Sequence, residues 1–113
     1  MATERIIRYV DLTQHQRDRL PIGISIEDGH PVEPKRIESP TWLAISYVIH
    51  ELHGERYILY FLTAEGRFID FAQRRSLEAA MDEVGAVVQH RDWRECSLAI
   101  GKDWERIPRE AIG

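Results

Sequence analysis

One short segment constrains the fold of this chain more than any other. The longest uninterrupted apolar run extends from Tyr57 to Leu62, within a predicted strand at 56–63. Successive side chains of a β-strand point to opposite faces of its sheet. The run therefore divides into two apolar sets, Ile58, Tyr60 and Leu62 on one face and Tyr57, Leu59 and Phe61 on the other. Because both faces of this strand are apolar, the folded protein must cover both faces of the sheet.

An amphipathic helix predicted over about 77–89 can cover one of these faces. Ser76 is its expected N-cap, and Glu78 places a negative charge in the first turn, where it suits the helix dipole. Apolar residues recur at helical spacing at Leu77, Ala80, Met81, Val84 and Val88. Gly85 weakens this helix by up to ~1 kcal/mol relative to alanine. The other face needs the first forty residues, a second subunit or a partner protein.

The segments beside the apolar run predict an antiparallel meander over about 42–73. The expected elements are strands at 41–52, 56–63 and 67–73, joined by turns at His53-Gly54 and Ala64-Glu65-Gly66. A helix over 40–53, with Ser39 as N-cap and Pro40 at the first helical position, is an alternative interpretation of the first of these strands. The strand is favoured, because β-branched and aromatic residues are crowded together there.

A further strand is expected at about 94–100, after Trp93. Cys96, Leu98 and Ile100 alternate there with Glu95, Ser97 and Ala99, as in a strand that is buried on one side. The order of meander, helix and strand predicts an α+β domain whose helix packs on one face of the sheet.

The first forty residues differ in composition from the rest. Thr13 and Gln16 have the spacing of a capping box, which predicts a short helix over about 14–20 that ends at Pro21. Ile22, Ile24 and Ile26 form a weak strand signal. Four of the five prolines lie within a segment at about 21–40, which we interpret as irregular. With 113 residues, we expect a single domain over 1–113 that contains this segment.

Charge and cysteine content exclude several classes of function. Fifteen Lys and Arg residues against nineteen Asp and Glu give a net charge of −4, which argues against nucleic-acid binding through a basic face. The single cysteine, Cys96, excludes an intramolecular disulfide and a multi-cysteine zinc site. No apolar run approaches the length of a membrane span and no signal peptide is visible, so we expect a cytoplasmic protein without membrane contact.

The best-motivated ligand site in the sequence is an anion site at Arg74, Arg75 and Ser76. These residues stand directly before the predicted helix, where free backbone N–H groups and the helix dipole favour a negative charge. Two guanidinium groups beside them suit a phosphate or a carboxylate. The alternative is a pair of solvated arginines in a loop.

No metal or cofactor is expected. His50-Glu51-Leu52-His53 resembles the zinc-peptidase motif but places its histidines three residues apart instead of four. Cys96 is expected to be an inert, buried thiol. The sequence contains no phosphate-binding glycine loop, nucleophile elbow or Cys-x-x-Cys pair, so we expect a protein that is not an enzyme.

Four residues of the meander are predicted to face a partner: Trp42, Tyr57, Tyr60 and Asp70. The three aromatic residues belong to the apolar excess of the meander. Asp70 shares a strand face with Phe68 and Ala72, so it is either a carboxylate at the edge of a pocket or the point where the sheet emerges into water.

The segment Tyr57–Trp93 resembles small uncharacterised bacterial proteins, some of which look like immunity proteins, which neutralise a toxin by binding it. The resemblance consists of a hairpin around Gly66, a helix that opens with Ser76-Leu77-Glu78-Ala79-Ala80, and Trp93 before a strand. It covers about a third of the chain and implies a fold but no functional residues.

These observations lead to three hypotheses. The first is a binding protein of the immunity or inhibitory type, without enzymatic activity. Its expected partner is a different protein with a basic surface. The second is a small-ligand protein or small enzyme with a pocket near Asp70, Arg74 and Arg75. The third is a homodimer that buries the uncovered sheet face against a second copy.

Overall fold

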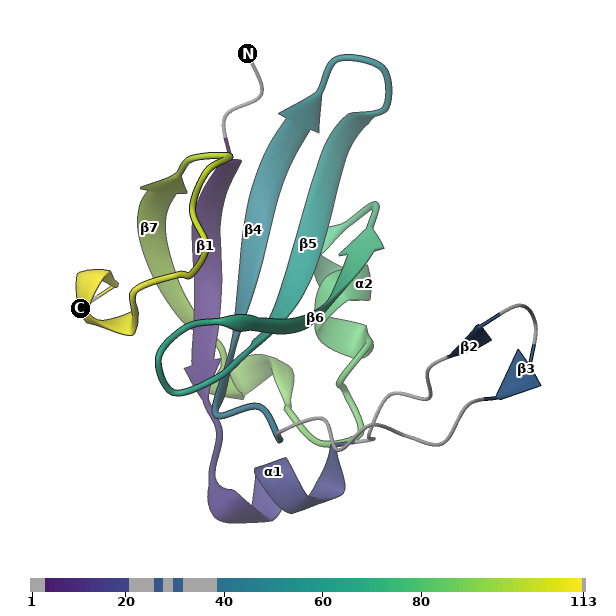
Figure 1. Ribbon diagram of the computed structural model, residues 1–113, viewed down its shortest axis with the longest axis vertical. Helices are drawn as coiled ribbons and strands as arrows, with labels where there is room; N and C mark the ends of the chain where they lie inside the picture. Colours follow the sequence, from purple (N-terminus) through teal and green to yellow (C-terminus); the bar gives the residue numbers. More distant parts are fainter. Residues whose placement is uncertain (1–3, 21–25, 28–29, 32–38, 113) are drawn as a thin grey trace.

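The computed structural model describes residues 4–20, 26–27, 30–31 and 39–112 (Figure 1). The elements are β1 (Glu4–Asp11), α1 (Gln14–Arg19), β2 (Ile26–Glu27), β3 (His30–Pro31), β4 (Trp42–His50), β5 (Gly54–Leu62), β6 (Phe68–Arg74), α2 (Leu77–Asp82) and β7 (Arg94–Ile100), with short 3-10 turns at His90–Asp92 and Arg109–Ala111. The weak strand signal at Ile22 and Ile24, and most of the proline-rich segment, lie outside the described residues.

Five strands form one antiparallel sheet in the order β6-β5-β4-β1-β7. The predicted meander is confirmed as β4, β5 and β6, and the predicted last strand is confirmed as β7. The alternative helix over 40–53 is wrong, because this segment is the central strand of the sheet. The protein is therefore α+β and mostly β.

The strand that the sequence analysis missed is β1, which lies between β4 and β7. A β-bulge shifts its register between Ile6 and Arg8. As a result Ile6 and Tyr9, three residues apart, are buried in the same cluster, while Val10 is buried in the other. The extra residue of the bulge breaks the two-residue alternation by which a strand is recognised.

The first helix is confirmed and the second is shorter than predicted. Thr13 caps α1. Its hydroxyl accepts a hydrogen bond from the backbone N–H of Gln16 at 3.2 Å, and the backbone N–H of Thr13 donates to the Gln16 side chain at 2.9 Å. α2 ends at Asp82 instead of about residue 89. Turns follow, in which the N–H of Gly85 bonds to the carbonyl of Asp82. Glycine at this position weakens a continuing helix.

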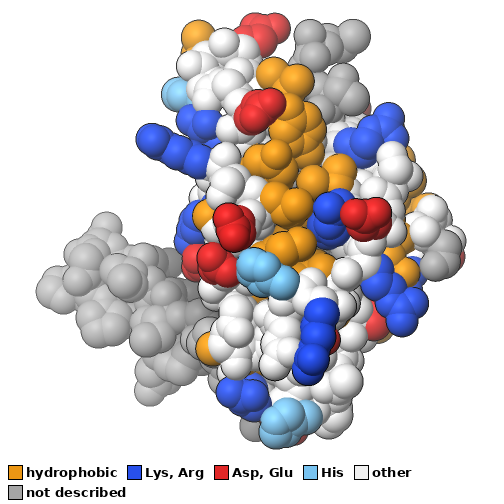
Figure 2. Space-filling model, turned by 180° about the vertical axis from the view of Figure 1, so that it is seen from behind, with side chains coloured by type: hydrophobic (Ala, Val, Ile, Leu, Met, Phe, Trp, Pro, Cys, Tyr) orange, Lys and Arg blue, Asp and Glu red, His pale blue; other side chains and the backbone are white. Residues whose placement is uncertain are grey.

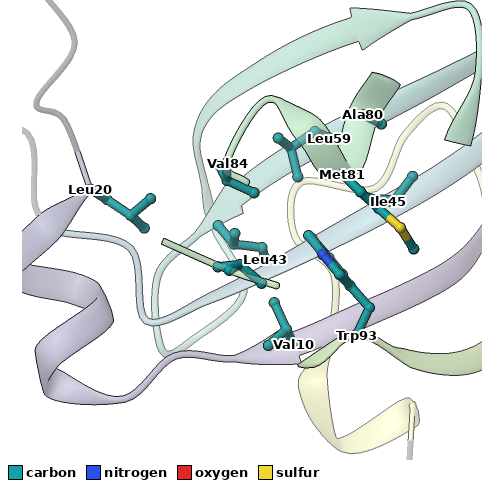
Figure 3. Close-up of a cluster of buried hydrophobic side chains, with 10 residues drawn as sticks. Val10, Leu20, Leu43, Ile45, Leu59, Ala80, Met81, Val84 and Trp93 are labelled. Atoms are coloured by element: carbon teal, nitrogen blue, oxygen red, sulfur yellow. The ribbon is translucent and has the colours of Figure 1, made fainter. Parts of the chain in front are cut away.

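The first sheet face is covered by α2 and the turns after it (Figure 3). The first core cluster consists of Val10, Leu20, Leu43, Ile45, Leu59, Ala80, Met81, Val84, Val88 and Trp93. Although the helix ends early, the turns keep Val84 and Val88 in the positions that the helical pattern assigned to the core. Tyr57 and Phe61 pack against this cluster, as the alternation of the apolar run predicts.

The second sheet face is covered by the C-terminal segment, residues 101–112, which crosses in front of β1 in Figure 1. The second core cluster consists of Ile6, Tyr9, Trp42, Ala44, Leu62 and Ile107, with Tyr60 and Ile112 packed against it. The division of the apolar run between two faces is thus confirmed. We expected this cover to come from the first forty residues, a second subunit or a partner protein. The sequence did not indicate the C-terminal segment, because the residues after Gly101 carry no periodic pattern.

A backbone hydrogen bond and the side chain of Arg109 help to hold the C-terminal segment to the sheet. The N–H of Ile107 donates to the carbonyl of Gly66 at 2.8 Å, and Gly66 has a φ of 84°. The guanidinium of Arg109 donates to both carboxylate oxygens of Asp11, at 2.9 and 2.7 Å, and lies 4.4 Å from the ring centre of Tyr9. A bidentate ion pair and a cation–π contact thus join the end of the chain to its first strand.

We predict that Gly66→Ala destabilises the protein far more than Gly54→Ala. Both glycines have positive φ, which costs alanine about 1–2 kcal/mol. A Cβ at Gly66 would also lie 1.8 Å from the carbonyl oxygen of Ile107, whereas a Cβ at Gly54 would meet nothing within 4 Å. Urea unfolding should therefore show an additional loss of stability only in Gly66→Ala. Equal losses would mean that the contact with Ile107 does not hold the C-terminal segment.

We also predict a pH-dependent contribution from Asp11. The hydrogen bonds from Arg109 lower the pKa of this carboxyl below its ordinary value of 3.8. Its ionisation therefore stabilises the folded protein above about pH 4, and this contribution is lost as the pH falls through the folded-state pKa. Because the pair is partly exposed, Asp11→Asn should cost no more than about 1 kcal/mol at pH 7.

The measurement is chemical denaturation of both proteins from pH 7 down to pH 3. The stability difference between wild type and Asp11→Asn should shrink as the pH falls, and it should be small at every pH in an Arg109→Gln background. A difference that does not change with pH would contradict the prediction.

Candidate functional site

The second sheet face is only partly covered, and a hollow of about 330 Å³ remains open on it. Its lining comes from β1, β5, β6, the end of β7 and the turn after β7: Glu4, Tyr60, Phe68, Phe71, Ile100, Gly101, Lys102 and Trp104. Of the large hydrophobic side chains that are exposed in the described residues, three border this hollow, namely Phe68, Phe71 and Trp104. They are 39%, 63% and 39% exposed.

Strand pairing brings the rings of β5 and β6 together. Tyr60 pairs directly with Phe71 across the two strands. The register then shifts, so that Phe68 pairs with Leu62, and the Tyr60 and Phe68 rings lie 5.0 Å apart at 51°. In a regular strand, residues 68 and 71 would point to opposite faces. The bulge in β6 therefore allows both phenylalanines to border one hollow.

The third exposed ring comes from the turn after β7. The N–H of Trp104 donates to the carbonyl of Gly101 at 3.2 Å. The indole lies close against this glycine, since a Cβ there would be 3.2 Å from the indole Cδ1 and Nε1 atoms. A side chain at position 101 would thus push the indole away from its present position beside Ile100 and Lys102.

The polar group of the hollow is the carboxylate of Glu4. Its Oε1 atom accepts hydrogen bonds from the Ser46 hydroxyl, at 2.7 Å, and from the Tyr60 hydroxyl. Ser46 is completely buried, so Glu4 satisfies a hydroxyl that would otherwise be without a partner. Burial, followed by the hydrogen bond to Glu4, raises the pKa of Tyr60 well above its usual range. Tyr60 therefore remains a neutral donor that holds the carboxylate in place.

This arrangement has the chemistry of a cation site. Aromatic rings present a negative electrostatic face, and a carboxylate adds a full negative charge beside them. Lys102 is the one cationic side chain in the lining. An anion is disfavoured by Glu4, whereas a cation with an apolar body finds both attractive charge and contact area.

The structure places the four residues predicted to face a partner in different environments. Tyr60 lines the hollow. Tyr57 lies on the opposite face, half-buried, with its ring 5.3 Å from that of Tyr47. Trp42 is 1% exposed and its indole N–H donates to the carbonyl of Thr63, so it belongs to the core and not to the surface. A partner role for Tyr57 stays a prediction; Figure 2 shows hydrophobic side chains gathered on the back face that Tyr57 shares.

Asp70 lies at a second hollow, of about 510 Å³, between β6 and the turn after α2. Its lining includes Arg74, as the sequence hypothesis expected, but not Arg75. Arg74 is engaged in an ion pair with Glu83 at 2.7 Å. The Ser76 hydroxyl accepts from the N–H of Ala79 as the cap of α2. An anion site at Arg74, Arg75 and Ser76 stays a prediction, and a ligand there would compete with Glu83 for Arg74.

The remaining sequence candidates can also be placed. His50 and His53 lie at the end of the β4–β5 hairpin with ring centres 4.8 Å apart. The described part of the chain contains no group of three His, Cys, Asp or Glu side chains arranged to hold a metal ion. Burial raises the pKa of the Cys96 thiol, in agreement with an unreactive cysteine. None of the described helices is long and apolar enough to cross a membrane.

Sequence reasoning missed most of the first hollow. Glu4 lies on the strand that was not predicted, and Trp104 lies in a segment without periodicity. Phe68 and Phe71 were not among the residues of the meander that we predicted to face a partner. No local signal indicated that they share a face, because a spacing of three places two residues on opposite faces of a regular strand.

Comparison of this chain with family models, with curated proteins and with solved structures found no match. The function is therefore argued from the chemistry of the site. Its central element is the bond between Tyr60 and Glu4, which can be tested without a ligand.

We predict that Tyr60 makes the protein sensitive to alkali. Its pKa is higher in the folded than in the unfolded chain, where it ionises near pH 10. Its contribution to stability is therefore complete below pH 10 and is lost as the pH rises above that value. Wild type should lose stability above pH 10 more steeply than Tyr60→Phe. Tyr57→Phe is the control, because that tyrosine packs on the opposite face of the sheet, away from Glu4. Parallel pH profiles for wild type and Tyr60→Phe would contradict this role.

Proposed function

We propose that this protein is a binding protein without enzymatic activity, and that it recognises a positively charged segment of another protein at the first hollow. The observation that carries this proposal is the convergence of Phe68, Phe71 and Trp104 around the carboxylate of Glu4. Large exposed apolar side chains that share one patch are typical of interaction sites. Aromatic residues also contribute much of the binding energy at protein interfaces.

The charge of the surroundings supports a basic partner. The net charge of the chain is −4, and Asp103 and Glu105, on either side of Trp104, are exposed. Arg106 is paired with Glu110 at 3.1 Å, which reduces its positive field near the hollow. Acidic groups around an apolar patch favour fast association with a basic surface.

An inhibitory role, of the kind that immunity proteins have toward toxins, is one use of such a surface and forms part of the proposal. A second copy of the chain is the competing occupant. It is the less favoured one, since two copies would bring two Glu4 carboxylates together.

The second hollow supports a second candidate function, the binding of a small molecule. Its volume of about 510 Å³ and its mixed lining, with Asp70, Arg74 and several apolar side chains, suit a small polar ligand. The ion pair between Arg74 and Glu83 makes this candidate weaker, because an anionic ligand would have to displace Glu83.

The proposed function predicts that the protein binds short basic peptides and not acidic ones. Amide NMR titration with a lysine-rich peptide and with its glutamate counterpart is the measurement. Only the basic peptide should shift the indole N–H signal of Trp104, while the signals of the buried Trp42 and Trp93 stay in place. Phe71→Ala should weaken binding by about tenfold, an effect of the size expected for an interface aromatic residue.

Leu52→Ala is the matched control for this experiment. Leu52 is 84% exposed but lies at the end of the β4–β5 hairpin, away from the hollow, so its substitution should leave binding unchanged. Equal binding of acidic and basic peptides would overturn the proposal. A dimer in sedimentation equilibrium that Phe71→Ala dissociates would assign the patch to a second copy instead.

A further inference from the structure

We infer that the first hollow is an aromatic cage for one methylated ammonium group, carried by a lysine side chain of the partner protein. This inference rests on the proposed function and specifies the group that enters the hollow. It follows from three properties of the lining: the number of rings, the scarcity of hydrogen-bond acceptors, and the size of the hollow.

The rings supply attraction for a cation from several sides. Tyr60, Phe68 and Phe71 come from two paired strands, and Trp104 faces the same hollow from a separate segment. A cation within about 6 Å of a ring centre is attracted by the negative face of the ring, and the attraction is stronger when the cation is desolvated. Four aromatic rings around one hollow can contact a bound cation from several sides at once, as in an aromatic cage.

The acceptors decide which cation fits best. A primary ammonium has three N–H donors and a guanidinium has five, and each donor needs an acceptor when it leaves water. Among the described lining side chains, the one carboxylate is that of Glu4, and its Oε1 atom already accepts from Ser46 and Tyr60. Its Oε2 atom is the second carboxylate oxygen, and one oxygen does not supply acceptors for the three donors of a primary ammonium or the five of a guanidinium. A trimethylated ammonium has no N–H donor, so it gains from the rings and from the charge of Glu4 without leaving a donor unpaired.

The size of the hollow is consistent with a head group. Its volume of about 330 Å³ lies at the lower end of the range for ligand sites, which is roughly 300–1,000 Å³. The hollow opens on the surface of the sheet between β6 and the turn after β7, so a lysine side chain can reach it from a bound peptide. Lys102, at the rim, places a positive charge near the entering cation and opposes its binding.

The test compares four probes by NMR titration of the full chain, with the Trp104 indole signal as readout. The probes are a peptide with one trimethyllysine, the same peptide with unmodified lysine, choline, and 3,3-dimethylbutanol, which is a neutral molecule of the same shape as choline. The trimethyllysine peptide should bind about tenfold more tightly than the unmodified peptide. Choline should compete for the same site more weakly, and the neutral molecule should not compete.

Three variants test the roles of individual residues. Trp104→Ala and Glu4→Gln should each weaken binding of the trimethyllysine peptide by about tenfold, while Leu52→Ala should have no effect. Because Trp104→Ala has no indole signal at this position, its binding is followed by the backbone amide signals of Phe71 and Gly101, which line the same hollow. Lys102→Ala should strengthen binding severalfold, because it removes a like charge. Circular dichroism spectra identical to that of the wild type would show that Trp104→Ala and Lys102→Ala are folded. These two variants then test the inference by themselves, because the first should lower the affinity and the second should raise it.

The outcomes separate this inference from the proposed function. If both peptides bind equally and both lose affinity in Phe71→Ala, the cage is overturned and the protein-binding function stands. If neither peptide binds, both proposals fail. If the neutral molecule competes as well as choline, the site is an apolar pocket and not a cation cage. If choline binds more tightly than the trimethyllysine peptide, the ligand is a free amine and the assignment to a partner protein is overturned.

Discussion

The fold depends on the burial of its central strand on both faces. Five consecutive residues of β4, from Trp42 to Ser46, are buried, and their side chains alternate between the two core clusters. Each face therefore needs its own cover. On one face α2 and the turns after it supply the cover, and on the other the C-terminal segment supplies it through Ile107. The contacts of that segment with Gly66 and Asp11 tie the last residues of the chain to the hairpin and to the first strand.

The candidate site exists because the C-terminal segment covers only part of the second face of the sheet. Ile107 shields the part of the sheet near Trp42 and Leu62, but β6 and the far end of β1 remain open to solvent. The open part retains aromatic side chains that a monomeric domain has no need to expose. The carboxylate of Glu4 is held among them by a buried serine and by a tyrosine that stays neutral. The proposed binding site thus lies where the core is incomplete.

Two β-bulges explain both the shape of this site and its absence from the sequence prediction. The bulge in β1 breaks the alternation of the N-terminal strand, and the bulge in β6 places Phe68 and Phe71 on one face. A bulge cannot be recognised from local alternation, because its extra residue is defined only by the register of the neighbouring strand. The meander, the α1 cap and the last strand could be predicted, since turn residues, capping residues and regular alternation are local signals.

The sequence by itself determined that the central strands are apolar on both faces, that the sheet needs two covers, and that Val84 and Val88 belong to the core. These properties depend on residue type and spacing, and they persist even where the expected helix ends early. Only the tertiary structure decided that the C-terminal segment is the second cover and that Glu4, Tyr60, Phe71 and Trp104 meet around one hollow. The physical reason is that these residues come from widely separated parts of the chain. Strand pairing and core packing bring them together, and neither leaves a periodic signal in the segments that carry them.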